Sequence, residues 1–234
     1  MNPTSRADFI DIHTHYAKPA SGVFTVESLL AHENRLPGPV EGIAYTAGIH
    51  PWYLNNMNKA EQLDYVRKLA DDPNIIAIGE AGFDRLRGPD IELQRQVFEE
   101  QVTIADRFQK PVVIHCVRSW DELLSAHKKL KPGKPWLVHG FRGKKDLARQ
   151  LLARGMYLSF WFDFVIRPES AELLPALPMD RIFLETDGAD IDIRDIYRKV
   201  AKDLNIEVDE LKDILFKNFN TLFCDQNHPV TPAA

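Results

Sequence analysis

The sequence has few cysteines, no long hydrophobic run and no excess of positive charge, and each of these absences disfavours a class of protein. Two cysteines in 234 residues, Cys116 and Cys224, do not form the disulfide framework of a small secreted domain. No stretch approaches the length of a membrane span, and residues 1–8 lack the apolar centre of a signal peptide. The net charge of −5 argues against a broadly basic surface but allows a local basic cleft. We therefore expect a cytoplasmic protein with no membrane contact and no obligate protein partner.

What the chain does contain is an alternation of short apolar runs with longer segments of helical period. This alternation is typical of repeated strand–helix units around a parallel sheet. Strands are expected at residues 8–13, 23–29, 42–48, 75–79, 112–114, 136–138, 156–162 and 181–184. The segment 23–29 is also compatible with the start of a helix. If it is a strand, the total is eight, the number that closes a TIM-type (β/α) barrel, regular or distorted.

Helices are expected between the strands and after the last strand. Their predicted ranges are 58–70, 90–108, 120–130, 144–154, 193–204 and 208–223. Asn58 and Glu61 have the spacing of a capping box at the start of the first helix. No linker or repeat divides the chain, so we expect one domain over residues 1–224 and a frayed tail over residues 225–234.

Residue types that bind metal ions recur where the predicted strands end. They are His13, His15, His50, Glu80, His115, His139 and Asp187. The remaining histidines, His32, His127 and His228, have helix, loop or tail contexts. A single histidine at a strand end is often only a side chain that hydrogen-bonds a loop. Their recurrence at the carboxyl ends of barrel strands, where active sites collect, instead predicts a site for two metal ions that share a carboxylate.

Two other kinds of catalytic site are disfavoured. Residues 79–82 have too few glycines at the required spacing for a dinucleotide-binding loop. Cys116 adjoins His115, but neighbouring residues of a strand point to opposite faces. We therefore expect Cys116 to pack outside the barrel interior and to take no part in catalysis.

Taken together, the motifs resemble those of the TatD family of metal-dependent hydrolases. The matching segments, in the family's order, are residues 10–15, 48–51, 77–84, 111–115, 138–141 and 184–187, followed by 218–223 in the last helix. The resemblance implies a TIM-type barrel of the amidohydrolase superfamily with two divalent metal ions. It also implies hydrolysis of phosphoesters, typically as a deoxyribonuclease, so that DNA or another phosphoester is the expected substrate.

The resemblance also implies a role for each strand-end residue. His13, His15 and Asp187 would hold one metal ion, His115 and His139 the other, and Glu80 would bridge the two. Asp187 and Glu80 would be the catalytic carboxylates, with Asp187 orienting or deprotonating the attacking water. His50 would contact the substrate phosphate.

The chain departs from the family at the rim of the expected site. An arginine that family members carry two residues after the histidine of residues 111–115 is replaced by Val117, and Arg118 follows it. Arg142 lies where the family commonly has serine, and the segment before His50 is short. The expected metal ligands are retained, so hydrolysis is still expected, whereas the groups that select the substrate have changed.

Basic and aromatic residues follow several strand ends, and the sequence leaves two interpretations of each group open. Arg118, Arg142, Lys144 and Lys145 would bind a phosphate backbone or would be solvated charges at helix starts. The aromatic residues Trp52, Tyr53, Trp161 and Phe162 would stack on bases or, more commonly, pack in the core.

Two alternative functions also remain open. An amidohydrolase would cleave a small-molecule C–N or ester bond with the same metal pair. A catalytically silent barrel would bind metal or a partner, although no expected ligand is missing. Histidine and carboxylate ligands suit zinc, manganese, iron or nickel, and magnesium less well.

Overall fold

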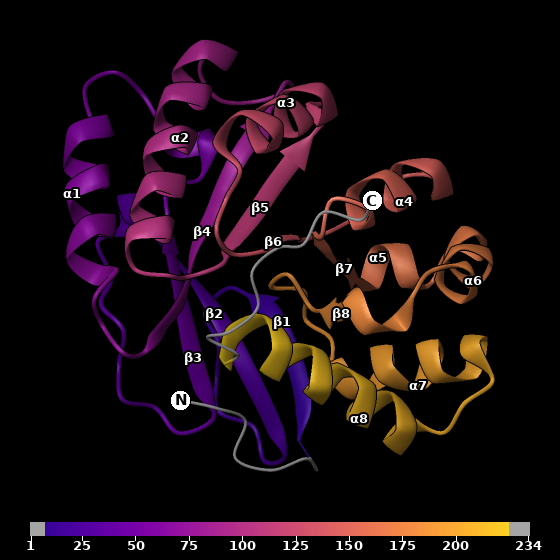
Figure 1. The fold of residues 1–234 in the computed structure, drawn as a ribbon. Coiled ribbons are helices and arrows are strands. Elements are labelled where there is room, and N and C mark those ends of the chain that lie inside the picture. The colour runs from indigo at the N-terminus through magenta and orange to yellow at the C-terminus, as the bar shows by residue number, and fades with distance from the viewer. Residues whose placement is uncertain (1–7, 225–234) are drawn as a thin grey trace.

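A computed structural model describes residues 8–224, and a sheet of eight parallel strands occupies its centre (Figure 1). Each strand pairs with the next along the chain, in the order β1 to β8. The strands are β1 (Phe9–Thr14), β2 (Val23–Leu30), β3 (Ile43–Gly48), β4 (Ile75–Asp84), β5 (Val112–Val117), β6 (Trp136–Val138), β7 (Tyr157–Trp161) and β8 (Ile182–Glu185). The predicted TIM-type barrel is therefore confirmed, and residues 23–29 belong to a strand.

Helices surround this sheet, with α1 and α2 on one side and α7 and α8 on another (Figure 1). The α-helices are α1 (Lys59–Leu69), α2 (Ile91–Arg107), α3 (Trp120–Leu130), α4 (Lys145–Leu152), α5 (Phe162–Val165), α6 (Pro168–Leu173), α7 (Ile193–Leu204) and α8 (Val208–Phe219). Short 3₁₀ turns are η1 (Ala31–Glu33), η2 (Pro51–Tyr53), η3 (Leu174–Ala176) and η4 (Met179–Arg181), and η5 (Asn220–Cys224) is π-helical. Among residues 8–224, no helix combines the length and apolar character that a membrane crossing requires.

Local differences from the sequence expectations have identifiable causes. Asn58 precedes α1 as expected, but its Oδ1 accepts a hydrogen bond from the Asn55 amide at 2.8 Å instead of capping the helix, so the predicted capping box is wrong. Asp90 does cap α2, accepting from the amides of Glu92 and Leu93. Helices α5 and α6 follow β7 and were missed from the sequence, because each spans six residues or fewer, too short for a helical period to show.

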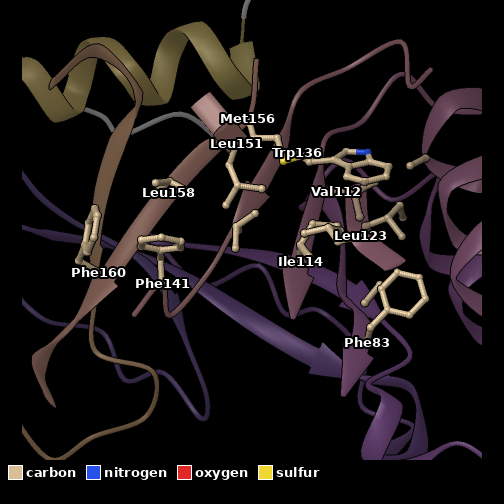
Figure 2. Packing of buried hydrophobic residues seen from close by; sticks show 14 of the residues in the cluster. Phe83, Val112, Ile114, Leu123, Trp136, Phe141, Leu151, Met156, Leu158 and Phe160 are labelled. Carbon is tan, nitrogen blue, oxygen red and sulfur yellow. The ribbon is translucent and has the colours of Figure 1, made fainter. Parts of the chain in front are cut away.

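Two apolar layers place the site at one end of the barrel. One layer packs the outer side of the sheet against the helices, and Figure 2 shows part of it, including Trp136 of β6 and Leu123 of α3. The other layer contains Val113, Leu137 and Phe183 and reaches Phe219 of α8. These three strand residues lie two positions before His115, His139 and Glu185, so they share the inner face with them. The barrel interior is thus apolar towards the amino ends of the strands and polar at their carboxyl ends.

The sheet is not closed by a regular ladder between β1 and β8, and side chains together with one backbone hydrogen bond join this seam instead. Tyr197 of α7 is fully buried, and its hydroxyl accepts from the amide of Ile10 and donates to the carbonyl of Ile10, each at 3.1 Å. Thr186 donates to Asp11 from its amide at 3.0 Å and from its hydroxyl at 2.6 Å. The amide of Asp187 donates to the carbonyl of His13 at 3.0 Å.

The domain assignment for residues 1–224 stays a prediction. The tail expected at residues 225–234, including His228, lies outside the described residues.

Candidate metal centre

The carboxylate of Glu80 lies at the centre of the histidines that the sequence singles out. Its Oε1 is 2.7 Å from His139 Nε2, 2.9 Å from His115 Nδ1 and 3.1 Å from His50 Nε2. Its Oε2 is 3.5 Å from His13 Nε2 and 3.6 Å from His15 Nε2. The two oxygens of one carboxylate therefore face two different groups of imidazoles.

Glu80 lies within β4 rather than at its end, because this strand runs to Asp84 and not to Gly79 as predicted. Gly79 and Gly82 have φ angles of 140° and 150°, which L side chains rarely adopt. A Cβ added at these positions would overlap the carbonyl oxygens of Val113 and His115, respectively. The glycines thus allow β4 to approach β5 closely and bring Glu80 beside His115.

Asp187 completes the group from the other edge of the seam. Its Oδ1 is 3.7 Å from His13 Nε2 and 3.8 Å from His15 Nε2, and its side chain is 25% exposed. Its φ of 51° lies in the left-handed region, which aspartate tolerates better than most residues. Every residue predicted to bind metal therefore lies in one cluster: His13, His15, Glu80, His115, His139 and Asp187.

Two further carboxylates hold histidines of the cluster, and sequence reasoning gave neither a role. Asp84 Oδ2 lies 3.2 Å from His115 Nε2, which leaves Nδ1 of that ring directed at Glu80. Glu185 is fully buried, and its Oε1 lies 3.4 Å from His139 Nδ1. Carboxylates in this position fix the orientation of metal-binding histidines in many proteins. Both residues lie in the motif segments 77–84 and 184–187, and this position was the only feature of the sequence that pointed to a role for them.

Burial and neighbouring charges set the protonation of the cluster. Burial alone raises the pKa of Glu80, but His139 and His50 outweigh it and hold that pKa well below its usual range. Burial lowers the pKa of His15 to about 4 and also lowers the pKa of His50. Both rings are therefore neutral near pH 7, and the neutral imidazole of His15 is in the form that binds a metal ion.

Buried polar atoms without partners test whether the cluster fits a cation. Within residues 8–224, both ring nitrogens of His13 and Oε2 of Glu80 are buried and have no hydrogen-bond partner. Burying such atoms unpaired is costly, so they are rare unless something else satisfies them. Nitrogen and carboxylate donors that converge in this way fit a divalent transition metal. The cluster is therefore able to hold metal ions.

His50 differs from the other histidines in the atom that it directs at the cluster. Its Nδ1 accepts a hydrogen bond from the amide of Trp52 at 3.0 Å. The neutral ring therefore carries its proton on Nε2, the atom that faces Glu80. His50 is in this form a hydrogen-bond donor to the site rather than a ligand.

A cavity of about 930 Å³ opens onto the cluster. Arg118 and Arg142 both line it with exposed side chains, and the guanidinium of Arg142 lies 4.9 Å from the centre of the Trp161 ring. Lys144 and Lys145 are exposed but do not line this cavity. Cys116 packs against the outer apolar layer, as strand alternation predicts, and also reaches the cavity border. Burial raises the pKa of its thiol, which disfavours a nucleophilic thiolate.

The parallel eight-stranded barrel makes the chain a TIM-type α/β protein. Its candidate metal centre lies at the carboxyl ends of the strands, where active sites of this fold collect. Residues 23–224 match the family described as TatD related DNase, and the chain belongs to that family.

Individual relatives agree with this assignment. The chain is 36% identical over 171 residues to a protein of Cronobacter turicensis named 3′-5′ ssDNA/RNA exonuclease TatD, covering 68% of this chain and 62% of the relative. A protein of the same name from Erwinia tasmaniensis is 34% identical over 151 residues, covering 61% of this chain and 57% of the relative. The matches thus span less than two thirds of the length of these relatives.

Solved structures show the same fold. A TatD homologue from Escherichia coli K12 has a TM-score of 0.80, at 22% identity, over 94% of this chain and 100% of that chain. A TatD family hydrolase from Entamoeba histolytica has a TM-score of 0.75, at 18% identity, over 92% of this chain and 98% of that chain.

Proposed function

We propose that the protein is a divalent-metal-dependent phosphodiesterase that hydrolyses single-stranded DNA or RNA from the 3′ end. Membership of the TatD family and the names of the two exonuclease relatives support this substrate class. The observation that carries the proposal is the convergence of five imidazoles on the two oxygens of Glu80. This arrangement lies on the floor of a cavity that two arginines line.

In this proposal His13, His15 and Asp187 hold one metal ion, His115 and His139 hold a second, and Glu80 contributes one oxygen to each. The support is the division of the two Glu80 oxygens between the two groups of histidines. Zinc, manganese, iron and nickel suit these donors better than magnesium. When bound, two such ions polarise a phosphate ester and lower the pKa of a water molecule towards neutrality.

The side chains around the metal positions have separate tasks. Asp187, which is partly exposed to the cavity, orients the attacking water and accepts its proton at a carboxylate oxygen. His50 donates a hydrogen bond from Nε2 to a nonbridging phosphate oxygen, because its Nδ1 is occupied by the amide of Trp52. Arg118 and Arg142 bind phosphates of the strand along the cavity wall.

The test is the metal content of the purified protein together with its cleavage of single-stranded oligonucleotides before and after chelation. We expect about two metal ions per chain, cleavage that a chelator stops, and loss of turnover in the Asp187→Ala variant. Asp190→Ala is the matched control, since Asp190 is an exposed aspartate three residues away that does not line the cavity.

Other results would assign the site differently. A metal-loaded protein that cleaves small amides or esters but no nucleic acid would be an amidohydrolase. A metal-loaded protein without any hydrolytic activity would be a silent binding barrel. Full activity of the Asp187→Ala variant in a pure preparation would refute the proposed mechanism.

A further inference from the structure

Trp52 places a partly exposed indole on the wall of the cavity next to the metal centre. It lies in η2, directly after β3, and is 36% exposed. Its ring meets those of His50 and His115 edge to face, with centroids 4.8 Å and 5.7 Å apart. A large apolar ring that is neither buried nor remote from the reacting centre is available for contact with a substrate.

The indole is held in place by a buried carboxylate. Its Nε1 donates to Asp84 Oδ2 at 2.6 Å, and the same oxygen lies 3.2 Å from His115 Nε2. Asp84 is 3% exposed, and the amides of Leu86 and Arg87 donate to its other oxygen at 2.7 Å and 3.1 Å. The carboxylate is therefore fixed, and it sets the indole relative to a proposed metal ligand.

A positive charge lies against the same ring. The guanidinium of Arg87 is 4.1 Å from the centre of the Trp52 ring, within the range of a cation–π contact. Arginine stacked on tryptophan is a combination that single-stranded nucleic-acid sites use for bases and backbone together. Arg118 and Arg142 are the arginines that line the cavity itself.

We propose that Trp52 is a platform on which one base of the bound strand stacks, and that Asp84 holds this platform beside the metal centre. The inference rests on the proposed nuclease function. Stacking recognises the flat face that all bases share, so the site reads the presence of a base and not its identity. Paired bases are already stacked in a duplex, so the platform selects single-stranded ends.

The test compares oligonucleotides that carry ordinary or abasic residues on both sides of the last phosphodiester bond. For the metal-loaded wild type we expect a KM about 5- to 150-fold higher on the abasic strand, the size of one base–aromatic stack. The Trp52→Ala variant should show the higher KM on both strands, and Trp52→Phe, which keeps a ring, an intermediate value. Leu86→Ala is the control, since Leu86 is an exposed apolar side chain on the same cavity that offers no ring.

Each other outcome has a distinct meaning. If Trp52→Ala still distinguishes the two strands as the wild type does, the platform is refuted and the nuclease proposal stands. If Trp52→Ala loses its metal ions, the role of Trp52 is structural and the platform is again refuted. If the metal-loaded wild type cleaves neither strand, the proposed function fails and the inference fails with it.

Discussion

Glu185 holds His139 from inside the barrel without reaching the cavity. Its Oε1 accepts from the amide of Gly140 at 2.7 Å, and its Oε2 accepts from the hydroxyl of Ser159. These bonds fix the carboxylate, with Oε1 3.4 Å from His139 Nδ1, where its charge favours a proton on that nitrogen. We therefore expect Glu185 to affect a bound cation through His139 and not as a ligand itself.

Replacing this carboxylate should weaken metal binding. We expect the Glu185→Gln variant to bind Mn²⁺ or Zn²⁺ about 10- to 100-fold more weakly, because the amide no longer orients His139 or raises its basicity. Isothermal titration calorimetry on the metal-free protein measures this change. Glu172→Gln, an exposed substitution on α6, is the control, and equal affinities for the two variants would contradict the assignment.

His127 of α3 makes stability depend on pH far from the metal centre. Burial, followed by the charge of Arg154, lowers its pKa from 6.5 to about 4. The folded state therefore favours the neutral ring, and this contribution is complete above pH 6.5 and is lost as the pH falls through 4. Allowing for the partial exposure of the ring, the loss is about 1–2 kcal/mol.

The His127→Phe variant should lose less stability in acid than the wild type. Phenylalanine keeps a ring near Trp136, whose centroid lies 4.8 Å from that of His127, but it cannot take up a proton. Urea unfolding on either side of this pH window measures the difference. The same acid-induced loss in both proteins would show that His127 does not contribute.

At the scale of elements, the junction between β1 and β8 depends on α7. The amide and carbonyl of Ile10 point away from β2. They would therefore lack hydrogen-bond partners without the hydroxyl of Tyr197. The Tyr197→Phe variant keeps the edge-to-face contact with Phe9, with ring centroids 5.1 Å apart, but leaves both backbone groups of Ile10 unpaired. We expect the free energy of unfolding to fall by about 2 kcal/mol, measured by urea titration. An unchanged midpoint would mean that another group satisfies Ile10.

The elements also show how far sequence reasoning reaches. Six of the eight strands and the predicted ligands follow from apolar runs that end in or near a histidine or a carboxylate, whereas β2 and β7 carry no such residue at their ends and follow from apolar character alone. The length of β4 does not, because Gly79 and Gly82 read as the end of a strand, while their positive φ values in fact let the strand continue. Asp84 and Glu185 were missed for a related reason: their role comes from contacts with histidines on neighbouring strands, which spacing along the chain does not reveal.

At the scale of the whole molecule, the number of phosphates that its cations neutralise sets how strongly salt weakens nucleic-acid binding. If only Arg118 and Arg142 bind phosphates, the slope of log affinity against log salt for a single strand should be about −1.4. Fluorescence anisotropy with the Asp187→Ala protein measures binding without cleavage.

Single substitutions separate the two contributions to this slope. Arg118→Gln and Arg142→Gln should each reduce it by about 0.7. Arg167→Gln is the control, because Arg167 is exposed, pairs with Asp163 and does not line the cavity. A slope much steeper than −1.4 in the parent protein would reveal further phosphate contacts.

Because no ladder joins β1 and β8, side chains supply most of the contacts that hold the ring of strands closed at this seam. His13 and His15 belong to one edge of this opening and Asp187 to the other, and their ligand atoms lie within 4.8 Å of one another. If these three residues bind the proposed cation, it would tie the two edges together, and its binding free energy would resist the opening of the ring. Withdrawing it would then loosen the barrel at the point where its first and last strands meet. Chelation would thus lower the melting temperature of the protein as well as its activity, and the two losses would share one origin.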